Sequence, residues 1–415
     1  MKIVLAPDKF KGCLSAAAVC EAMATGIRSV DPSIIIDACP MADGGEGTVD
    51  ALVAATGGRT VTRRVTGPLP GMKVDAPIGL LGSTGLTAGG DGQTAVIEMA
   101  AASGLHLLRS EQYDPTRTTT YGTGELLLAA AEIGVRRIIL GIGGSATVDG
   151  GIGAAQAWGA RFVLKTGQTY SAGDRRLTGG DLKQLLRFDW PAASRENPPS
   201  RRRLLGDAGV TATVPQYEPL LDTRGVDFVI ACDVGNPLVG RDGAAAIFGP
   251  QKGATLEQIR ELDDGLRQLA EKLLRTPLAD APGAGAAGGL GFGMMAFFGG
   301  TLRPGAAIVM EATNLRDRLR DATLCLTGEG QLDAQSLSGK TAISVARVCR
   351  DLNVPCIALA GALAPGHEAA HAEGLTAAFP IASGPMSLEE SLRNTAALLS
   401  VTTANVVRTF TASAG

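Results

Sequence analysis

The chain has 415 residues, of which 45% are hydrophobic, 19% are charged and only 4% are aromatic, and its formal net charge is −3. This length predicts two or three domains, and the apolar content suffices for large cores, which excludes a disordered or fibrous protein. Basic residues are scattered among acidic ones, so we expect no nucleic-acid partner.

The opening residues and the cysteines indicate the compartment. The first residues, MKIVLAPDKF, lack the long apolar segment of a secretory signal. The sequence contains no run of about 18 apolar residues, so we expect no membrane span. The seven cysteines are dispersed and form no C-x-x-C pair, so we expect them to be reduced and structural. We therefore expect a cytoplasmic protein without a membrane partner.

The first sixty residues repeat one pattern of strand, loop and helix. Apolar strands are predicted at residues 2–6 and 34–39, and each is followed by a loop and then a helix, the first with Ser15 as its N-cap. This order is typical of parallel strands joined by right-handed crossovers. Both loops then lie at the carboxyl edge of the sheet, where open α/β folds bind ligands.

The rest of the chain continues this pattern. Further apolar strands are predicted at residues 95–99, 137–140, 228–232, 323–326, 356–359 and 377–381. We therefore predict an α/β fold with two α/β domains and an active-site cleft between them.

The predicted first domain is discontinuous. Residues 1–66 and 282–415, from both chain ends, form a Rossmann-like parallel sheet, and residues 67–281 form an inserted, mixed α/β domain. Within the insert, residues 190–224 are polar, basic and proline-containing, which predicts a surface insertion.

Five loops combine glycines with an acid or a lysine. They are APDKFKG at 6–12, ADGGEGT at 42–48, GIGGSATVDGG at 141–151, CDVGNP at 232–237 and TGEGQLDAQSLSGK at 327–340. Glycines let backbone N–H groups approach an anion closely. Phosphoryl transfer needs such groups and lysines for the phosphates, carboxylates for Mg²⁺, and a carboxylate base for the hydroxyl. The loops therefore predict a small-molecule kinase.

Two other functions stay open. The segment His367-Glu368-Ala-Ala-His371 fits H-E-x-x-H, in which two histidines bind zinc and the glutamate acts as a base, so it predicts a zinc metallopeptidase. Its helix is short and lies between two predicted strands, which favours a surface connector. A non-catalytic nucleotide-binding module, which would bind ATP without turning it over, is the second alternative.

At these loops the sequence resembles the bacterial glycerate kinases that form 2-phosphoglycerate. The matching motifs follow the family order over nearly the whole chain, and they are APD at 6–8 with Lys11 and LSA at 14–16, ADGGEGT at 42–48, TTTYGTGEL at 118–126, GGSATVDGG at 143–151, ACDVGNPL at 231–238, IFGPQKG at 247–253, PGAGAAGG at 282–289 and LTGEGQLD at 326–333. The resemblance implies D-glycerate and ATP as substrates, Mg²⁺ as cofactor, and a discontinuous first domain. A homodimer is one oligomeric state that the sequence leaves open.

The chemistry of the side chains suggests a role for each candidate residue. The candidates for Mg²⁺ are Asp43, Glu46, Glu329 and Asp333. The candidates for the nucleotide phosphates are Lys11, Lys340, Ser336, Gly283, Gly285, Gly288 and Gly289. The candidates for binding glycerate are Ser145, Thr147, Arg117 and Asn236. The candidates for the base that accepts the hydroxyl proton are Asp149 and Asp233, with Asp149 preferred.

Overall fold

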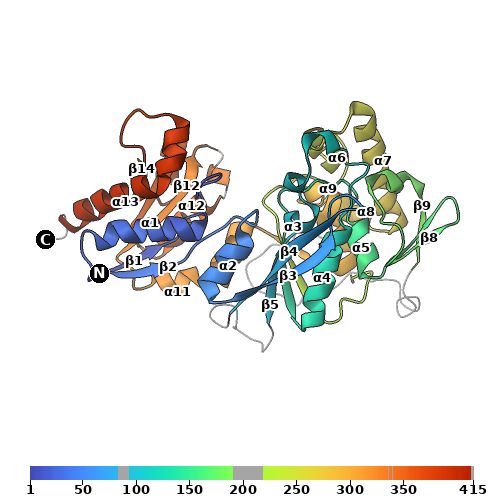
Figure 1. Cartoon of the computed structure of the whole chain (residues 1–415), viewed down its shortest axis with the longest axis horizontal. Helices are drawn as coiled ribbons and strands as arrows, with labels where there is room; N and C mark the ends of the chain where they lie inside the picture. Colours follow the sequence, from blue (N-terminus) through green and yellow to red (C-terminus); the bar gives the residue numbers. More distant parts are fainter. Residues whose placement is uncertain (83–92, 190–217, 335, 339, 413–415) are drawn as a thin grey trace.

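The computed structural model describes residues 1–82, 93–189, 218–334, 336–338 and 340–412, which form two α/β lobes side by side (Figure 1). Both chain ends lie in the first lobe, which is built on a five-stranded sheet. The second lobe is built on a six-stranded sheet and a small three-stranded one. Among the described helices, none has both the length and the apolar character that a membrane span requires.

The sheet of the first lobe is entirely parallel and has the strand order β14-β13-β12-β1-β2. Its strands are β1 (Lys2–Leu5), β2 (Ile35–Ala38), β12 (Leu324–Leu332), β13 (Cys356–Leu363) and β14 (Ala377–Pro380). The helices α1 (Ala16–Arg28), α11 (Leu315–Leu319), α12 (Thr341–Asp351) and α13 (Leu388–Ala412) belong to this lobe. The helices α2 (Thr48–Thr56) and α10 (Gly305–Ala312) lie between the two sheets, with α2 packed on β4 and β5 of the second sheet and α10 in contact with β10 and α12.

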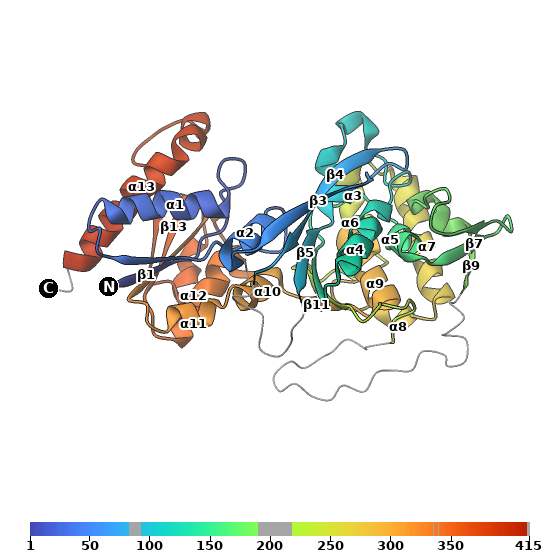
Figure 2. The ribbon, with the colours of Figure 1, turned by 60° about the horizontal axis from the view of Figure 1, so that its bottom comes forward.

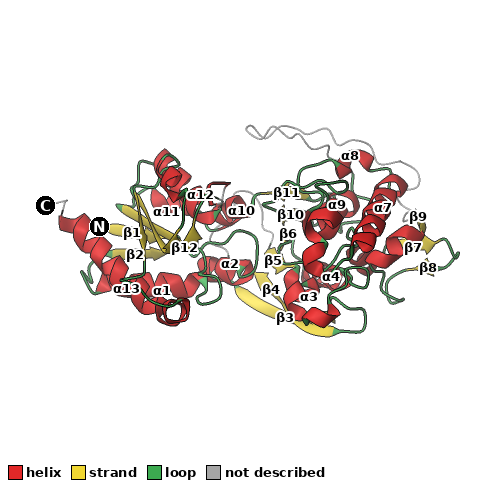
Figure 3. Cartoon of the chain, turned by 90° about the horizontal axis from the view of Figure 1, so that it is seen from above, coloured by secondary structure: helices red, strands yellow, loops and turns green. Residues whose placement is uncertain are grey.

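Helices cover both faces of this sheet (Figure 3). Ile3 and Leu5 of β1 pack with α1 and α13 on one face, whereas Val4 belongs to the core formed with α10 and α12 on the other. Successive side chains of a strand point to opposite faces, so a strand covered on both sides must be apolar throughout. The run IVL in β1 meets this requirement.

The six-stranded sheet of the second lobe has the strand order β11-β10-β6-β5-β4-β3. Its strands are β3 (Arg59–Thr66), β4 (Lys73–Leu80), β5 (Thr94–Glu98), β6 (Arg137–Gly141), β10 (Asp227–Ala231) and β11 (Thr301–Arg303). The four strands from β5 to β11 pair in parallel, and β4 pairs antiparallel with both β3 and β5. The small sheet consists of β7 (Arg161–Leu164), β8 (Thr169–Tyr170) and β9 (Leu185–Asp189).

Helices of the second lobe pack around these strands. They are α3 (Ala100–Ser103), α4 (Tyr121–Ile133), α5 (Ile152–Trp158), α6 (Ala244–Phe248), α7 (Leu256–Lys272), α8 (Thr276–Ala279) and α9 (Ala286–Phe298). α7 begins with a capping box, because the Thr255 hydroxyl accepts from the Gln258 N–H while the Gln258 side chain accepts from the Thr255 N–H. The two-domain α/β architecture predicted from the sequence is confirmed.

The two sheets divide the chain at positions that differ from the predicted boundaries. Strand β3 pairs with β4 in the second sheet, and β11 pairs with β10 in the same sheet. Residues 59–66 and 282–303 therefore lie with the second lobe, whereas the sequence-based division assigned them to the first domain. The polar sequence RTVTRRVT of β3 suits an outer strand of a sheet but gives no apolar run that would have placed it there. We place the boundaries just before β3 and just after β11, both of which Figure 2 shows in the second lobe.

Most of the predicted surface insertion, residues 190–217, lies outside the described residues. Its last part differs from the expectation of a polar surface segment. Leu220 and Leu221 are buried in the core of the second lobe, and the indole N–H of Trp158 donates to the Asp222 carbonyl at 2.8 Å. The adjacent leucines carry enough apolar surface to anchor the end of this segment.

Candidate active site

The loop after β2 joins the two lobes at the carboxyl ends of their strands. A side chain at Gly44 would lie 2.6 Å from the Ala231 Cβ atom at the end of β10, and Gly44 has a φ of +87°. Gly305, which follows β11, packs directly on the Asp43 backbone. Only glycine tolerates this approach, so these glycines hold Asp43 at the junction of the lobes.

Three acidic residues of the first lobe line one cavity of about 520 Å³. Asp8 follows β1, Asp43 follows β2, and Glu329 lies near the end of β12. The Asp8 carboxylate is fixed by the hydroxyl of Thr341, which donates to it at 2.7 Å, and by the N–H of Lys9, also at 2.7 Å. The parallel sheet thus gathers acids from three strands.

These acids lie where negative charge is costly. Burial, and next the charge of Asp43, raises the pKa of Asp8 to about 6. Burial also raises the pKa of Glu329 to about 7, although Lys340 opposes the shift. The Oε1 atom of Glu329 is buried and has no hydrogen-bond partner among the described residues. A buried carboxylate oxygen without a partner, among other carboxylates, indicates a place for a cation.

The second lobe contributes one more acid. Asp233 follows β10, and its Oδ1 accepts a hydrogen bond from the Gly305 N–H at 2.8 Å. Although the residue as a whole is exposed, partial burial of its carboxyl group raises its pKa to about 6, with further contributions from the charges of Asp43 and Asp8. Asp233 and Asp43 line a second cavity of about 350 Å³.

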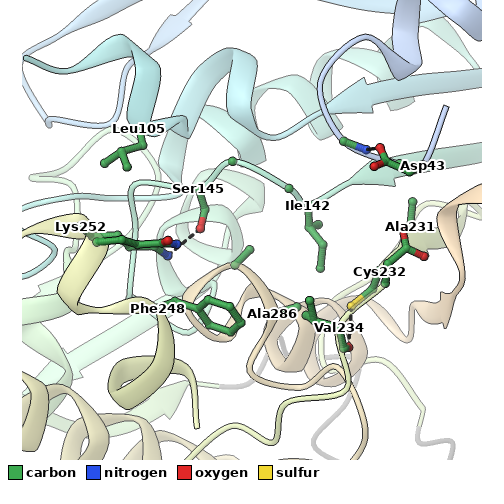
Figure 4. A pocket seen from close by; sticks show the side chains of 17 residues that line it. Asp43, Leu105, Ile142, Ser145, Ala231, Cys232, Val234, Phe248, Lys252 and Ala286 are labelled. Carbon is green, nitrogen blue, oxygen red and sulfur yellow. Dashed lines mark hydrogen bonds between the residues drawn. The ribbon is translucent and has the colours of Figure 1, made fainter. Parts of the chain in front are cut away.

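A buried lysine lies in the wall of this second cavity. Lys252 is only 2% exposed, and its ammonium group donates to the Ser145 hydroxyl at 2.7 Å and to the Thr147 carbonyl at 2.8 Å (Figure 4). Burial lowers the pKa of Lys252 to about 7, while the charge of Asp149 opposes this shift. Lys252 is therefore poised to be charged or neutral near neutral pH, and an anion in the cavity would favour the charged form.

The glycines at 283–289 shape the same cavity from behind. Ala287, Gly288 and Gly289 all have left-handed backbone angles, with φ of +53°, +69° and +87°. Gly283 and Gly285, like Gly288 and Gly289, are buried against neighbouring loops of the second lobe, and Ala286 and Ala287 line the cavity. The glycines permit close packing here, and they lie in the other lobe from Lys340, with which the sequence had grouped them.

Asp149, the preferred base, has a different position from the one predicted. It is fully buried, and its Oδ2 accepts from both the N–H and the hydroxyl of Thr120 at 2.8 Å, while its Oδ1 accepts from the Gly151 N–H at 3.0 Å. The described residues that line the two cavities do not include Asp149. Its oxygens fix two loops to one another, which favours Asp233 over Asp149 as the candidate base.

The remaining candidates divide between the cavities and the supporting structure. Lys11 and Lys340 line the larger cavity, Ser145 lines the smaller one, and Thr147 is buried behind it. The described residues that line the two cavities do not include four further candidates, Asp333, Ser336, Arg117 and Asn236.

These four have structural surroundings instead. Asp333 accepts from the Ser336 N–H at 3.0 Å and from the Gln331 side chain at 2.9 Å. Arg117 is exposed, and the Asn236 side chain donates to the Asp242 carbonyl at 2.8 Å. Glu46 is exposed and lines a neighbouring cavity of about 370 Å³, which shares Asp8 and Lys11 with the larger cavity but does not include Asp43 or Glu329.

Two site residues were missed by the prediction from sequence. Asp8 lies in the loop after the predicted strand 2–6, and the other acids were found in loops of the same kind, so a signal for it was present. Lys252 ends a short 3-10 helix (Pro250–Lys252) that no strand precedes. Its proximity to Ser145, 107 residues away in the chain, is visible only in the folded protein.

The histidines of the H-E-x-x-H segment lie on a short 3-10 helix (His367–His371). Their Nδ1 atoms are engaged with the carbonyls of Ala364 at 2.9 Å and Leu375 at 3.0 Å. Among the described residues, the group of potential metal ligands is instead formed by Cys325, Cys349 and Cys356. The zinc metallopeptidase alternative therefore finds no support.

Comparisons with known proteins agree with the chemistry of this cleft. The profile of the Glycerate kinase family matches residues 3–207 and 210–411. The chain is 44% identical to a glycerate kinase from Halalkalibacterium halodurans over 97% of both chains, and 44% identical to a glycerate 2-kinase from Escherichia coli over 95% of this chain and 93% of that one. A crystal structure from Salmonella typhimurium LT2, designated glycerate kinase 2, superposes with a TM-score of 0.81 at 41% identity, over 100% of this chain and 99% of the other. The chain therefore belongs to the glycerate kinase family and is an enzyme of that family.

Proposed function

We propose that this enzyme transfers the γ-phosphoryl group of ATP to the 2-hydroxyl of D-glycerate, forming 2-phospho-D-glycerate and ADP. The observation that carries the proposal is the position of Asp43, which lines both cavities at the junction of the lobes. A nucleotide in the larger cavity and glycerate in the smaller one would meet at this residue. The larger cavity is assigned to the larger substrate.

Glycerate is assigned to the smaller cavity because of Lys252 and Ser145. A carboxylate beside the Lys252 ammonium and the Ser145 hydroxyl would gain a charge-assisted hydrogen bond in a site shielded from water. The turn after β6 lies at the same cavity with Gly143 and Gly144, whose exposed backbone leaves room for a small anion.

Asp233 is assigned as the base. A carboxylate with a pKa of about 6 is mostly ionised at neutral pH and still accepts a proton effectively. It would take the proton of the 2-hydroxyl as that oxygen attacks the γ-phosphorus. The new O–P bond forms while the bond to the β-phosphate oxygen of ATP breaks, and ADP leaves with the electron pair.

Asp8, Asp43 and Glu329 are assigned to Mg²⁺. The buried Oε1 of Glu329 lacks a hydrogen-bond partner among the described residues, and oxygen ligands from carboxylates suit this ion. When bound, Mg²⁺ supplies positive charge against the phosphate oxygens. Lys11 and Lys340 line the same cavity and would neutralise further phosphate charge, which keeps the role predicted for them.

A coupled assay of ADP release tests the proposal. ATP and Mg²⁺ are supplied with D-glycerate, with L-glycerate or without an acceptor, and EDTA and a zinc-selective chelator are added in separate runs. We expect release only with D-glycerate, abolished by EDTA and insensitive to the zinc chelator. Binding of ATP without any release would instead favour the non-catalytic module, and activity lost to the zinc chelator would contradict the assignment of the metal.

A further inference from the structure

Three cysteines meet in the core of the first lobe, outside the proposed active site. Cys325 on β12 and Cys356 on β13 are directly paired residues of neighbouring parallel strands, and Cys349 lies on α12, which covers that face of the sheet. Their sulfur atoms all lie within 4.8 Å of one another. Two sulfurs bound to one zinc ion at about 2.3 Å each lie about 4 Å apart, so three sulfurs at this spacing can bind a single atom together.

The surroundings of the sulfurs restrict what they can bind. All three cysteines are completely buried, and the core around them includes Val345 and Ala346 of α12. The described residues place no further histidine, cysteine or acidic side chain in this group. Thiolates prefer soft ions, and a site with three sulfur ligands suits an atom whose stable complexes have three ligands.

Charge decides between the soft ions. Three thiolates around monovalent copper leave a net charge of two minus, and three around zinc leave one minus. An uncompensated charge in an apolar interior is costly, whereas three thiolates around a trivalent atom are neutral. All seven cysteines of the chain lie within the described residues and are free, so no disulfide competes for these three.

We propose that Cys325, Cys349 and Cys356 form a binding site for a trivalent arsenical such as arsenite. In the binding reaction As(OH)₃ exchanges its three hydroxyl groups for three cysteine sulfurs. Three S–H and three As–O bonds break, three As–S bonds form, and three water molecules leave. No oxidation state changes, and no net charge enters the core.

The site would join the elements that carry the acidic cluster. Glu329 follows Cys325 on the same strand, and Thr341, the first residue of α12, donates its hydroxyl to Asp8 at 2.7 Å. Since the sulfurs are fully buried, entry of arsenite requires a local opening of the core. Binding is therefore expected to be slow and to speed up on warming.

The test measures retained arsenic on the full chain. The protein is kept reduced with a phosphine, so that no dithiol competes, incubated with excess arsenite, passed through gel filtration and weighed by mass spectrometry under non-denaturing conditions. We expect one arsenic atom per chain, with the loss of three hydrogens, and a raised melting temperature. Cys349→Ala should lose both effects, whereas Cys39→Ala, which removes an equally buried cysteine of the same core, should keep them.

Two outcomes overturn the proposal: a wild-type chain that retains no arsenic even after incubation close to its melting temperature, or a Cys349→Ala variant that retains as much as the wild type. If this variant does not fold, X-ray absorption at the arsenic edge of the wild-type complex decides. Three sulfur neighbours support the site, and two sulfurs or oxygen neighbours contradict it. None of these readouts depends on the kinase activity.

Discussion

The ammonium nitrogen of Lys252 lies 2.7 Å from the hydroxyl oxygen of Ser145, inside a wall that excludes water. Among the described residues, the hydrogen-bond partners of this ammonium group are both neutral, namely the Ser145 hydroxyl and the Thr147 carbonyl. An anionic substrate in the adjoining cavity would place a further negative charge beside this ammonium group, in addition to the nearby Asp149 carboxylate. This pair therefore gives the assignment of glycerate its clearest test.

Replacing the lysine should weaken glycerate binding selectively. We predict that Lys252→Met raises KM for D-glycerate by about 10–100-fold, because a hydrogen bond to a charged group contributes about 1.5–3 kcal/mol. KM for ATP should change little. Lys183→Met, which removes an exposed lysine of the same lobe paired with Glu261, serves as the control and should leave both constants unchanged. A rise in KM for ATP alone would place the nucleotide in this cavity instead.

The protonation of Lys252 predicts a pH dependence. Burial lowers its pKa to about 7 in the free enzyme, so the ammonium form that binds a carboxylate is lost as pH rises above that value. Binding then requires the uptake of a proton, and KM for D-glycerate should rise by up to about tenfold per pH unit above neutrality. Below pH 7 it should be nearly constant. The same titration on Lys252→Met should be flat, and a flat profile for the wild type would contradict the role of the lysine.

The base should fail differently from the binding residues. We predict that Asp233→Asn lowers kcat by about 10²–10⁴-fold with both KM values nearly unchanged, because the amide cannot accept the hydroxyl proton. In the wild type, kcat should fall as pH drops below about 6, the pKa to which partial burial raises this carboxyl.

Asp149→Asn is the matched comparison for the base. Its carboxylate accepts hydrogen bonds from Thr120 and Gly151, so the substitution should lower the melting temperature. The fraction of enzyme that stays folded should keep a kcat well above that of Asp233→Asn. If folded Asp149→Asn loses activity to the extent predicted for Asp233→Asn, while Asp233→Asn stays active, the proposed assignment of the base is wrong.

Loss of a metal carboxylate should be compensated by metal. We predict that Glu329→Gln shifts the Mg²⁺ concentration for half-maximal activity upward by about tenfold or more, and that added Mg²⁺ restores most of the rate. Glu46→Gln removes an exposed acid that lines a different cavity and should leave the requirement unchanged. A Glu329→Gln variant with a normal Mg²⁺ requirement would remove this residue from the metal site.

The sequence predicted the parallel strands and the loops at their carboxyl ends, because apolar runs and glycine-rich turns are local signals. It could not rank the acids on those loops. Asp149 and Asp233 both follow apolar strands, and what separates them is the set of hydrogen bonds that Thr120 and Gly151 donate to Asp149. Likewise, no local sequence pattern marks Lys252 as a site residue, because its role depends on a contact with Ser145 that forms only in the folded protein.

The position of the phosphate on the product tests the central claim most directly. D-glycerate, ATP and Mg²⁺ are incubated with the enzyme, and the ³¹P spectrum of the product is recorded without proton decoupling. Phosphorylation of the 2-hydroxyl gives a phosphorus coupled to the single proton on its carbon, and hence a doublet, which is the result we predict. A triplet, from a phosphate on the CH₂ carbon, or the absence of any phosphorylated glycerate would contradict the account.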